Sequence, residues 1–457
     1  MENAQSMTAD YPDQLWRPLT QHAALRGTTP PQMQSAKGCT LTMNNGAQLL
    51  DGLAGLWCVN IGYGRREIAE IAARQMEQLN YLAPVMACEP TLALAEKMQT
   101  MLGFKCHSYF SSSGSEANET AFKIARQYHL QNGKQGDNRY KIISRYRAYH
   151  GNTAGAMSAT GQAERKSGSE PGATGFVHVM PPYPYRSHPK LTQLEHGEEC
   201  ARLLEEAIIH EGANTVAAVI MEPMMSGGGV IVPPDNYLPL VRQICDRYGV
   251  LLIFDEVVSG FGRLGTMFGY ENWATEADIY TFAKGLSSGY FPMGATVVKD
   301  HVFTGFDGAP DSMRHLRQVN TFGGHPVGAA IALEAISIVE RENLAGNARE
   351  QGDHVREVLC SELGQHPYVG EIRGLGMLTG IELVEDRDSK EPLSDAKIMA
   401  VLASCMGDGV ILGRTTNTVP GRCNVVLIAP PLVVTREEID RMAAAFTKAL
   451  KSVARGG

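Results

Sequence analysis

The sequence predicts an α/β protein built around one large sheet, and three observations lead to that prediction. At 457 residues the chain is too long for one small core. Its composition, 44% hydrophobic and 20% charged, is typical of a folded globular protein. Between about residues 105 and 300, short apolar runs alternate with helical patterns, and looser α/β segments flank this region on both sides. We therefore predict a large, parallel-sheet domain and a smaller domain assembled from both chain ends.

The charge balance and the cysteines narrow the class of protein. Lys and Arg number 41 and Asp and Glu 49, so the net charge is −8, which argues against nucleic acid or an anionic membrane as partner. The 9 cysteines form no C-x-x-C pair and no cluster with metal-ligand spacing, so we expect neither a metal site nor disulfides. No apolar run approaches membrane-spanning length, and residues 1–16 lack a signal pattern. A cytoplasmic protein is expected.

The N-terminal elements come first in chain order. Residues 1–36 are polar and are expected to form an extended arm. Asn44-Asn45-Gly46 joins two short runs and predicts a hairpin, and apolar residues at helical spacing predict a helix over 68–79. The glycine-punctuated stretch 53–64 is predicted to be a loop. Within it, Trp57 is either a pocket residue or a plain core residue.

A candidate anion site follows. Pro90 begins a helix, and a strand over 107–110 runs into the small-residue loop 111–116, after which another helix starts. The free N–H groups of a helix N-terminus, together with serine hydroxyls, favour an anion such as phosphate. The alternative is an ordinary serine-rich helix cap. Tyr149, just beyond the next strand (140–144), has an aromatic ring that can stack on a flat cofactor.

The second half of the large domain is predicted from apolar runs. Residues 161–195, rich in Gly, Pro, Ser and Tyr, are predicted to form a long surface loop. A buried strand over 216–221 ends at Glu222, and 295–298 forms a further strand. A long apolar helix is expected over 327–339, and the remaining residues again mix strand and helix.

Two neighbouring strands deliver an acid and a lysine to one edge of the predicted sheet. The apolar run 250–254 ends at Asp255, and the run 279–282 is followed by Lys284. Ligands of open α/β sheets collect beyond the carboxyl ends of the strands. A pyridoxal phosphate enzyme needs this pair, because the lysine forms a Schiff base with the aldehyde and the acid keeps the pyridine nitrogen protonated. The alternative is a strand-end salt bridge between the two residues.

Motifs of other enzyme classes do not fit the sequence. No G-x-x-x-x-G-K-[ST] motif for nucleotide phosphates occurs. Gly374-Leu375-Gly376 lacks the third glycine of a dinucleotide site, and Gly168-Ser169 does not satisfy the G-x-S-x-G pattern of serine hydrolases. The combination of a lysine and a phosphate loop is therefore favoured.

Six ordered motifs resemble those of the class III aminotransferases, which are pyridoxal 5'-phosphate (PLP) enzymes of fold type I. They are SGSEA (113–117), YHG (149–151), EP (222–223), DEV with GFGR (255–257 and 260–263), AKGLSSG (283–289) and TFGGHP (321–326). The resemblance extends from residues 51–64 to 429–432, and LWCVN (56–60) with Arg414 is most similar to the ω-amino acid or amine:pyruvate branch. It implies a large domain with a mostly parallel seven-stranded sheet, here 76–330. The arm and first part of the small domain would be 1–75, and its second part 331–457.

The resemblance also implies the roles of individual residues. Lys284 and Asp255 would be catalytic, and Lys284 would serve as the base for the proton shift. Thr321 would reach the cofactor phosphate of a neighbouring subunit, which implies a homodimer or a tetramer with shared sites. The implied cofactor-binding residues are Ser113, Gly114, Ser115, Tyr149, His150, Glu222, Asp255, Val257, Lys284 and Thr321, and the implied substrate-binding residues are Leu56, Trp57, Tyr149, Gly227 and Arg414.

The implied reaction is a ping-pong transfer of an amino group from an ω-amino acid or amine to a keto acid. Gly227 stands where the ornithine and 4-aminobutyrate members of the class place a glutamate that shields the arginine, and Met225 stands where glutamine is usual. Both departures predict an unmasked Arg414 and favour pyruvate over 2-oxoglutarate as acceptor. β-Alanine, taurine, 4-aminobutyrate and monoamines all remain as donors. A decarboxylase, an aminomutase and a non-catalytic relative are the alternatives.

Overall fold

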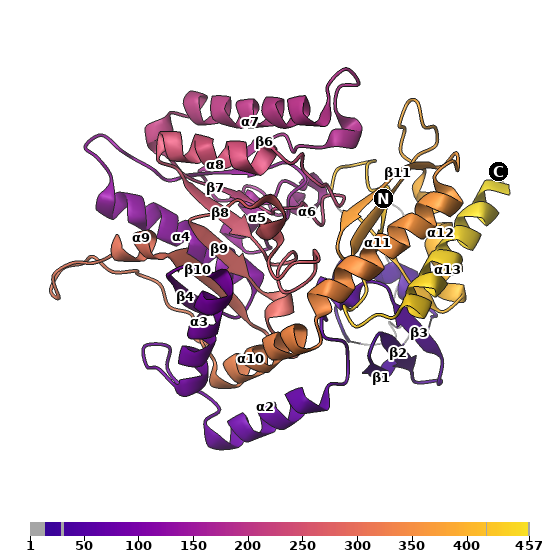
Figure 1. The fold of residues 1–457 in the computed structure, drawn as a ribbon, viewed down its shortest axis with the longest axis horizontal. Coiled ribbons are helices and arrows are strands. Elements are labelled where there is room, and N and C mark those ends of the chain that lie inside the picture. The colour runs from indigo at the N-terminus through magenta and orange to yellow at the C-terminus, as the bar shows by residue number, and fades with distance from the viewer. Residues whose placement is uncertain (1–13, 29–31, 417, 456–457) are drawn as a thin grey trace, which may run out of the picture.

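A seven-stranded, mostly parallel sheet forms the core of the large part of the molecule (Figure 1). The computed structural model describes residues 14–28, 32–416 and 418–455. Strands β5, β6, β7, β8 and β9 run parallel to one another, and β10 pairs antiparallel with both β4 and β9. The predicted α/β class is confirmed. The sheet order is β4 (Cys106–Ser111), β10 (Gly294–Lys299), β9 (Ile279–Phe282), β8 (Leu251–Asp255), β7 (Val216–Met221), β5 (Lys141–Arg145) and β6 (Phe176–Val179).

The central strands are apolar on both faces because helices cover both faces. In β7, Val219 and Met221 belong to one buried cluster with residues of α7 (Gln193–His210) and α8 (Tyr237–Tyr248). Ala218 and Ile220 belong to another buried cluster with α4 (Gly114–Asn132). Strands buried on both faces are apolar throughout, which explains why the sequence predicts β7, β8 and β9 closely.

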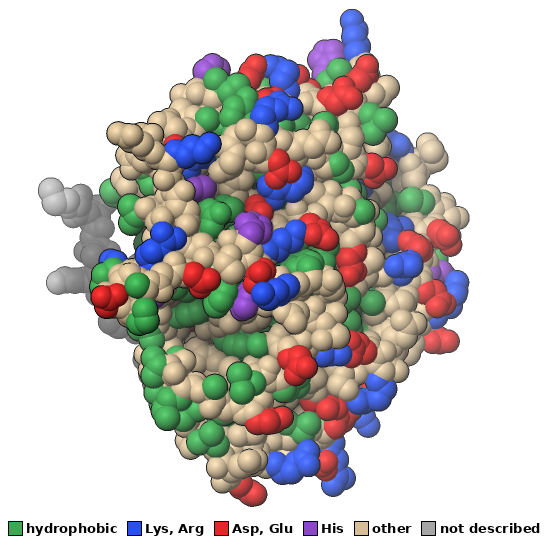
Figure 2. Space-filling view, turned by 60° about the vertical axis from the view of Figure 1, so that its left-hand side comes forward, with side chains coloured by type: hydrophobic (Ala, Val, Ile, Leu, Met, Phe, Trp, Pro, Cys, Tyr) green, Lys and Arg blue, Asp and Glu red, His purple; other side chains and the backbone are tan. Residues whose placement is uncertain are grey.

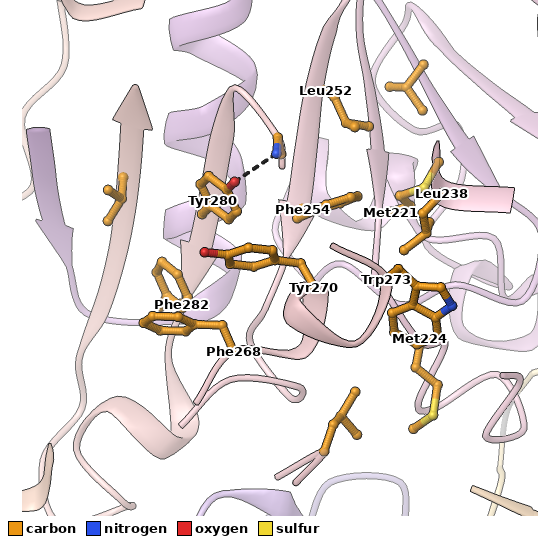
Figure 3. Close-up of a cluster of buried hydrophobic side chains, with 14 of the residues drawn as sticks. Met221, Met224, Leu238, Leu252, Phe254, Phe268, Tyr270, Trp273, Tyr280 and Phe282 are labelled. Atoms are coloured by element: carbon orange, nitrogen blue, oxygen red, sulfur yellow. Dashed lines mark hydrogen bonds between the residues drawn. The ribbon is translucent and has the colours of Figure 1, made fainter. Parts of the chain in front are cut away.

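Aromatic side chains support the ends of β8 and β9 (Figure 3). Phe254 and Tyr280 meet edge to face with ring centroids 6.2 Å apart, and Tyr270 lies 5.2 Å from Tyr280. The Tyr280 hydroxyl accepts a hydrogen bond of 2.8 Å from the Ala277 amide. Such close-packed rings leave the two strands little freedom. They fix the positions from which Asp255 and Lys284 emerge.

The predicted surface loop over 161–195 is wrong in its middle part. It contains the edge strand β6, the short helix α6 (Ala163–Lys166) and the 3₁₀ turn η2 (Pro184–Arg186), and α7 begins at Gln193. Strand β6 is four residues long and only Val179 in it is buried. A short, half-exposed edge strand among Gly and Pro residues gives little apolar signal, so its pairing with β5 decides its structure.

The smaller part of the molecule combines segments from both chain ends. One four-stranded sheet has the order β1 (Met33–Lys37), β2 (Thr40–Met43), β3 (Gln48–Asp51) and β13 (Val410–Ile411), and the parallel β3–β13 pair joins the two ends. A second sheet has the order β11 (Val369–Leu375), β12 (Leu378–Leu383), β15 (Val425–Ile428) and β14 (Gly413–Arg414). Helices α11 (Leu344–Leu363), α12 (Asp395–Gly407) and α13 (Arg436–Arg455) cover these sheets (Figure 1).

The hairpin around Asn44-Asn45-Gly46 is confirmed as β2 and β3. The predicted extended arm is only partly described, because residues 1–13 and 29–31 lie outside the described residues, and β1 already begins at Met33. The boundary expected between 330 and 331 falls inside α10 (Pro326–Arg341). The division at 75/76 and 330/331 stays a proposal.

The remaining elements complete the molecule. Basic and acidic side chains are interspersed over the face in Figure 2, with hydrophobic side chains gathered in a hollow and along the lower left. None of the helices in the described part of the chain is both long enough and apolar enough to cross a bilayer. The remaining helices are α1 (Ala54–Trp57), α2 (Arg66–Gln78), α3 (Glu89–Leu102), α5 (Ala154–Ala159) and α9 (Asp300–Thr304), and the remaining 3₁₀ turns are η1 (His22–Leu25), η3 (Ala213–Thr215), η4 (Gly269–Trp273) and η5 (Lys284–Leu286).

Candidate active site

A cavity of about 390 Å³ lies at the carboxyl edge of the large sheet, where the small domain contributes Gly413 and Arg414 to its wall. The predicted site residues converge there, with the single exception of Thr321. Those that line the cavity are Leu56, Trp57, Ser113, Gly114, Ser115, Tyr149, His150, Glu222, Gly227, Asp255, Val257, Lys284 and Arg414.

Asp255 is a buried acid at the end of β8. One carboxylate oxygen, Oδ2, lies 2.8 Å from Nδ1 of His150 and accepts a 2.8 Å hydrogen bond from the Asn118 side chain. The other oxygen accepts from the Val257 amide at 3.0 Å. The closest partners of Asp255 are thus His150 and Asn118, and within the described residues no salt bridge joins Asp255 to Lys284. The carboxylate is fixed in place and faces the cavity.

Lys284 follows β9 and is half-buried in the wall of the cavity. Its backbone is left-handed, with φ of 43°, a conformation that a non-glycine residue adopts at a cost of about 1–3 kcal/mol. Burial lowers the pKa of its amine, and the charge of Asp255 opposes that shift only in part. Nζ lies 5.3 Å from the centroid of the Trp57 ring. Desolvation thus favours the uncharged, nucleophilic form of the amine.

The N-terminus of α4 forms the anion end of the cavity. Ser113 is the N-cap residue and its hydroxyl accepts from the Glu116 amide at 3.2 Å. Within the described residues, the amides of Gly114 and Ser115 have no protein acceptor. A Cβ on Gly114 would lie 3.0 Å from both methyl groups of Val257, so a side chain here would press on Val257. Two amides at the positive end of a helix fit a phosphate group.

Three buried polar atoms of residues that line the cavity have no partner among the described residues. They are Nε2 of His150, Oε1 of Glu222 and Oγ1 of Thr415. The second oxygen of Glu222 accepts from the Ser226 amide at 2.8 Å, and burial raises the pKa of this carboxyl group. Unpaired buried polar atoms are costly, and they are expected where a ligand completes the site.

Several functional residues were missed by the sequence analysis. Asn118 lies inside α4, one turn after the anion loop, and holds both Asp255 and the His150 carbonyl. Gln162 and Arg165 line the cavity but fall in the stretch that was interpreted as a surface loop. A signal for Asn118 was present, because a polar residue on the inward face of a buried helix requires a partner. No comparable signal marks Arg165.

Arg414 is not unmasked, contrary to the prediction drawn from Gly227. Nη1 of Arg414 lies 2.5 Å from Oδ1 of Asp395, and Nη2 lies 3.4 Å from Oδ2. Asp395 begins α12 and could not be assigned to the site from sequence, since it is 19 residues away along the chain. A different acid therefore takes the place of the glutamate that Gly227 lacks.

Thr321 is exposed and lies outside the cavity. Its carbonyl accepts a 3.0 Å hydrogen bond from the Tyr81 hydroxyl, and Phe322 beside it is 59% exposed. Within one chain, Thr321 and the cavity are thus not brought together.

Comparison with known proteins agrees with this geometry. The family model "Aminotransferase class-III" matches residues 23–450. The chain belongs to the class III aminotransferases. It is 48% identical over 409 residues to the uncharacterized aminotransferase YhxA of Bacillus subtilis (strain 168), with 89% of each chain covered. It is 40% identical to the taurine–pyruvate aminotransferase of Bilophila wadsworthia, over 96% of this chain and 95% of that one.

A solved structure is similar over nearly its whole length. The crystal structure of a Bacillus anthracis aminotransferase superimposes with a TM-score of 0.92 at 43% identity, covering 96% of each chain. This class III aminotransferase therefore has the fold that its sequence motifs imply. The cavity residues and the fold both point to amino-group transfer as its chemistry.

Proposed function

We propose that this aminotransferase uses pyridoxal 5'-phosphate to move an amino group from an ω-amino acid or amine to a keto acid in a ping-pong reaction. Pyruvate is the acceptor that we favour. The observation that carries the proposal is the convergence of Asp255, Lys284 and the N-terminus of α4 on one cavity. When bound, the cofactor supplies an aldehyde for attachment and a ring that accepts electrons from the substrate carbon. Its phosphate fits the amides of Gly114 and Ser115.

Each residue of the site then has a defined task. Asp255, held by His150 and Asn118, would keep a proton on the ring nitrogen of the cofactor. Lys284 would hold the cofactor and afterwards, as an uncharged amine, take a proton from the donor carbon and deliver it to the former aldehyde carbon of the cofactor. Arg165 lies over one face of the Tyr149 side chain, so Tyr149 would contact the cofactor ring with its other face. Val257 would also lie against the cofactor ring. Ser113, His150 and Glu222 complete this binding set.

Pyruvate is supported as acceptor by the pocket and by the relatives. Gly227 places no side chain in the cavity, so a small acceptor has room beside Leu56 and Trp57. The taurine–pyruvate aminotransferase of Bilophila wadsworthia is named for that acceptor. Arg414 would bind the carboxylate bidentately after leaving Asp395. The decarboxylase, aminomutase and non-catalytic alternatives are not favoured, since family and relatives are aminotransferases.

A shared site explains the exposed apolar surface around Thr321. Phe322 is 59% exposed, and Tyr81, whose ring centroid lies 6.2 Å from that of Phe322, is 40% exposed. Apolar side chains exposed together indicate a protein interface. We infer a homodimer or a tetramer, in which Thr321 reaches the phosphate in the neighbouring subunit. Equal amounts of Lys284→Ala and Thr321→Ala chains are unfolded, mixed and refolded together. The mixture should regain activity that neither variant has alone, and failure to regain it would contradict a shared site.

We also place the enzyme in the cytoplasm. All nine cysteines are free thiols in the described residues, which fits a reducing compartment.

The direct test is the visible absorbance of the purified protein loaded with pyridoxal 5'-phosphate. Single donors are added without a keto acid: β-alanine, taurine, 4-aminobutyrate and a monoamine. We expect the absorbance to bleach with at least one donor and to return when pyruvate is added, with alanine as product. Release of carbon dioxide from an α-amino acid, with no response to these donors, would instead establish a decarboxylase.

A further inference from the structure

The cavity contains two guanidinium groups that differ in their partners. Arg414 is ion-paired with Asp395 at 2.5 Å, and its Nη1 also lies 3.4 Å from the Cys423 carbonyl. It lines a second, smaller cavity of about 280 Å³, which Asp395 and Glu164 make acidic. The pKa of Asp395 is lowered by the Arg414 guanidinium. Arg414 is thus already engaged by a carboxylate before a substrate enters.

Arg165 is positioned by neutral groups only. Its Nε donates a 2.7 Å hydrogen bond to the Gln162 side chain, and its Cζ lies 4.8 Å from the centroid of the Tyr149 ring. Gln162 is itself fixed, because it is buried and its amide donates to the Arg147 carbonyl at 2.9 Å. Across the described ranges, 14–28, 32–416 and 418–455, Arg165 forms no ion pair. Its charge nevertheless acts on the site, since it helps to lower the pKa of Lys284.

A fixed, half-buried guanidinium without an acid is a binding site for an anion. Two of its N–H groups can meet both oxygens of a carboxylate or sulfonate, and the surrounding apolar walls strengthen that attraction. Arg414 must first leave Asp395 to do the same. Arg165 needs no such exchange, so it is the guanidinium that is ready when a substrate enters.

We propose that Arg165 binds the anionic end of the amino donor, which makes ω-amino acids and ω-amino sulfonates the preferred donor class. This inference rests on the proposed function and specifies its donor. The amine of such a zwitterion reacts near Lys284 while its carboxylate or sulfonate pairs with Arg165. A diamine would place a second positive charge beside the guanidinium, and like charges repel. A monoamine gains nothing from Arg165.

The test compares donors in the variant Arg165→Gln, which keeps a polar side chain and removes the charge. The kcat/KM ratio of β-alanine, or of taurine, to a monoamine should fall about tenfold to a hundredfold, as expected when a charge-assisted hydrogen-bonded pair is lost. The loss should appear mainly in the KM of the zwitterionic donor. The same ratio for 1,4-diaminobutane should rise. Arg165→Lys should restore part of the β-alanine ratio.

Two controls separate this role from a structural one. Arg66→Gln makes the same change on an exposed side chain of α2 and should leave all donor ratios as in the wild type. Retention of cofactor absorbance in Arg165→Gln shows that the site is assembled. An equal loss for all donors would overturn the inference. If the wild-type enzyme transferred no amino group to pyruvate from any donor, the proposed function would fail instead.

Discussion

Two clusters of polar and ionisable residues in this enzyme are built in opposite ways. The site cluster comprises Asp255, His150, Asn118 and Lys284, and the interdomain cluster comprises Arg373, Glu382, Tyr183 and Arg186. In the interdomain cluster, Glu382 forms ion pairs with Arg373 at 2.7 Å and with Arg186 at 2.6 Å. Arg373 also donates hydrogen bonds to the Gly229 and Val230 carbonyls. In the site cluster, Nε2 of His150 remains without a partner among the described residues.

The pKa shifts show what this difference does. The two arginines lower the pKa of Glu382 in spite of its burial, so its charged form is stabilised. Burial lowers the pKa of Lys284, so its uncharged form is favoured. Complete pairing of charges makes a structural clamp between domains, whereas incomplete pairing keeps an amine reactive. Four experiments can break or sharpen this comparison.

Removing the amine should have the largest effect. Lys284→Ala removes both the attachment point of the cofactor and the proton-transfer base, so transamination should fall by about 10³-fold or more. The fold should persist, because the substitution removes a desolvated amine and breaks no ion pair within the described residues. Turnover with pyruvate and circular dichroism measure the two effects. Wild-type turnover in this variant would rule out the assigned role of Lys284.

Removing one member of the interdomain cluster should act on stability. Arg373→Met leaves Glu382 with only Arg186 and the Tyr183 hydroxyl and removes the partner of the Gly229 carbonyl, so the free energy of unfolding should fall by about 3–5 kcal/mol. The measurement is urea unfolding. Arg202→Met, on the exposed surface of α7, is the matched control and should change stability far less. Equal losses in both variants would show that the interdomain cluster is not a clamp.

In the turn over residues 226–229, Gly227 lines the cavity and the Gly229 carbonyl accepts from Arg373, and two adjacent glycines in this turn should respond differently. A Cβ on Gly228 would lie 2.5 Å from the Arg147 carbonyl oxygen, so Gly228→Ala should cost about 1–3 kcal/mol. A Cβ on Gly227 would lie 3.6 Å from the Gln162 side chain and 3.7 Å from Trp57, so Gly227→Ala should cost less than about 0.5 kcal/mol. Its effect should appear in substrate preference instead. Similar thermal unfolding of both variants would contradict the packing described for the turn.

The smallest expected effect is a shift in the pH at which the rate of cofactor capture reaches half of its maximum. In the cofactor-free enzyme, the uncharged Lys284 amine is the form that captures pyridoxal 5'-phosphate. The capture rate should therefore rise with pH and level off around a midpoint below the ordinary lysine value of 10.5. The growth of visible absorbance over a pH series measures it. A midpoint at or above 10.5 would mean that burial does not favour the neutral amine.

Much of the fold and of the site could be predicted from the sequence. Strands β7, β8 and β9 are continuous apolar runs, and Asp255 and Lys284 follow them directly, so a local pattern was enough to place both. Gly114 and Ser115 were recognised because a strand, small residues and a helix start stand in one short stretch. Edge strand β6 was not predicted, because its structure depends on pairing with β5 rather than on its own apolarity.

The chain sequence by itself determined the fold class, the strand ends that carry the chemistry and the family to which the enzyme belongs. These depend on residues close together along the chain, where burial and helix ends leave a pattern. Only the tertiary structure decided that Asp395 neutralises Arg414, that Arg165 has no acid partner among the described residues and that Asn118 and His150 hold Asp255. Such pairings join segments far apart in sequence, and a charge carries no mark of its partner until the chain has folded.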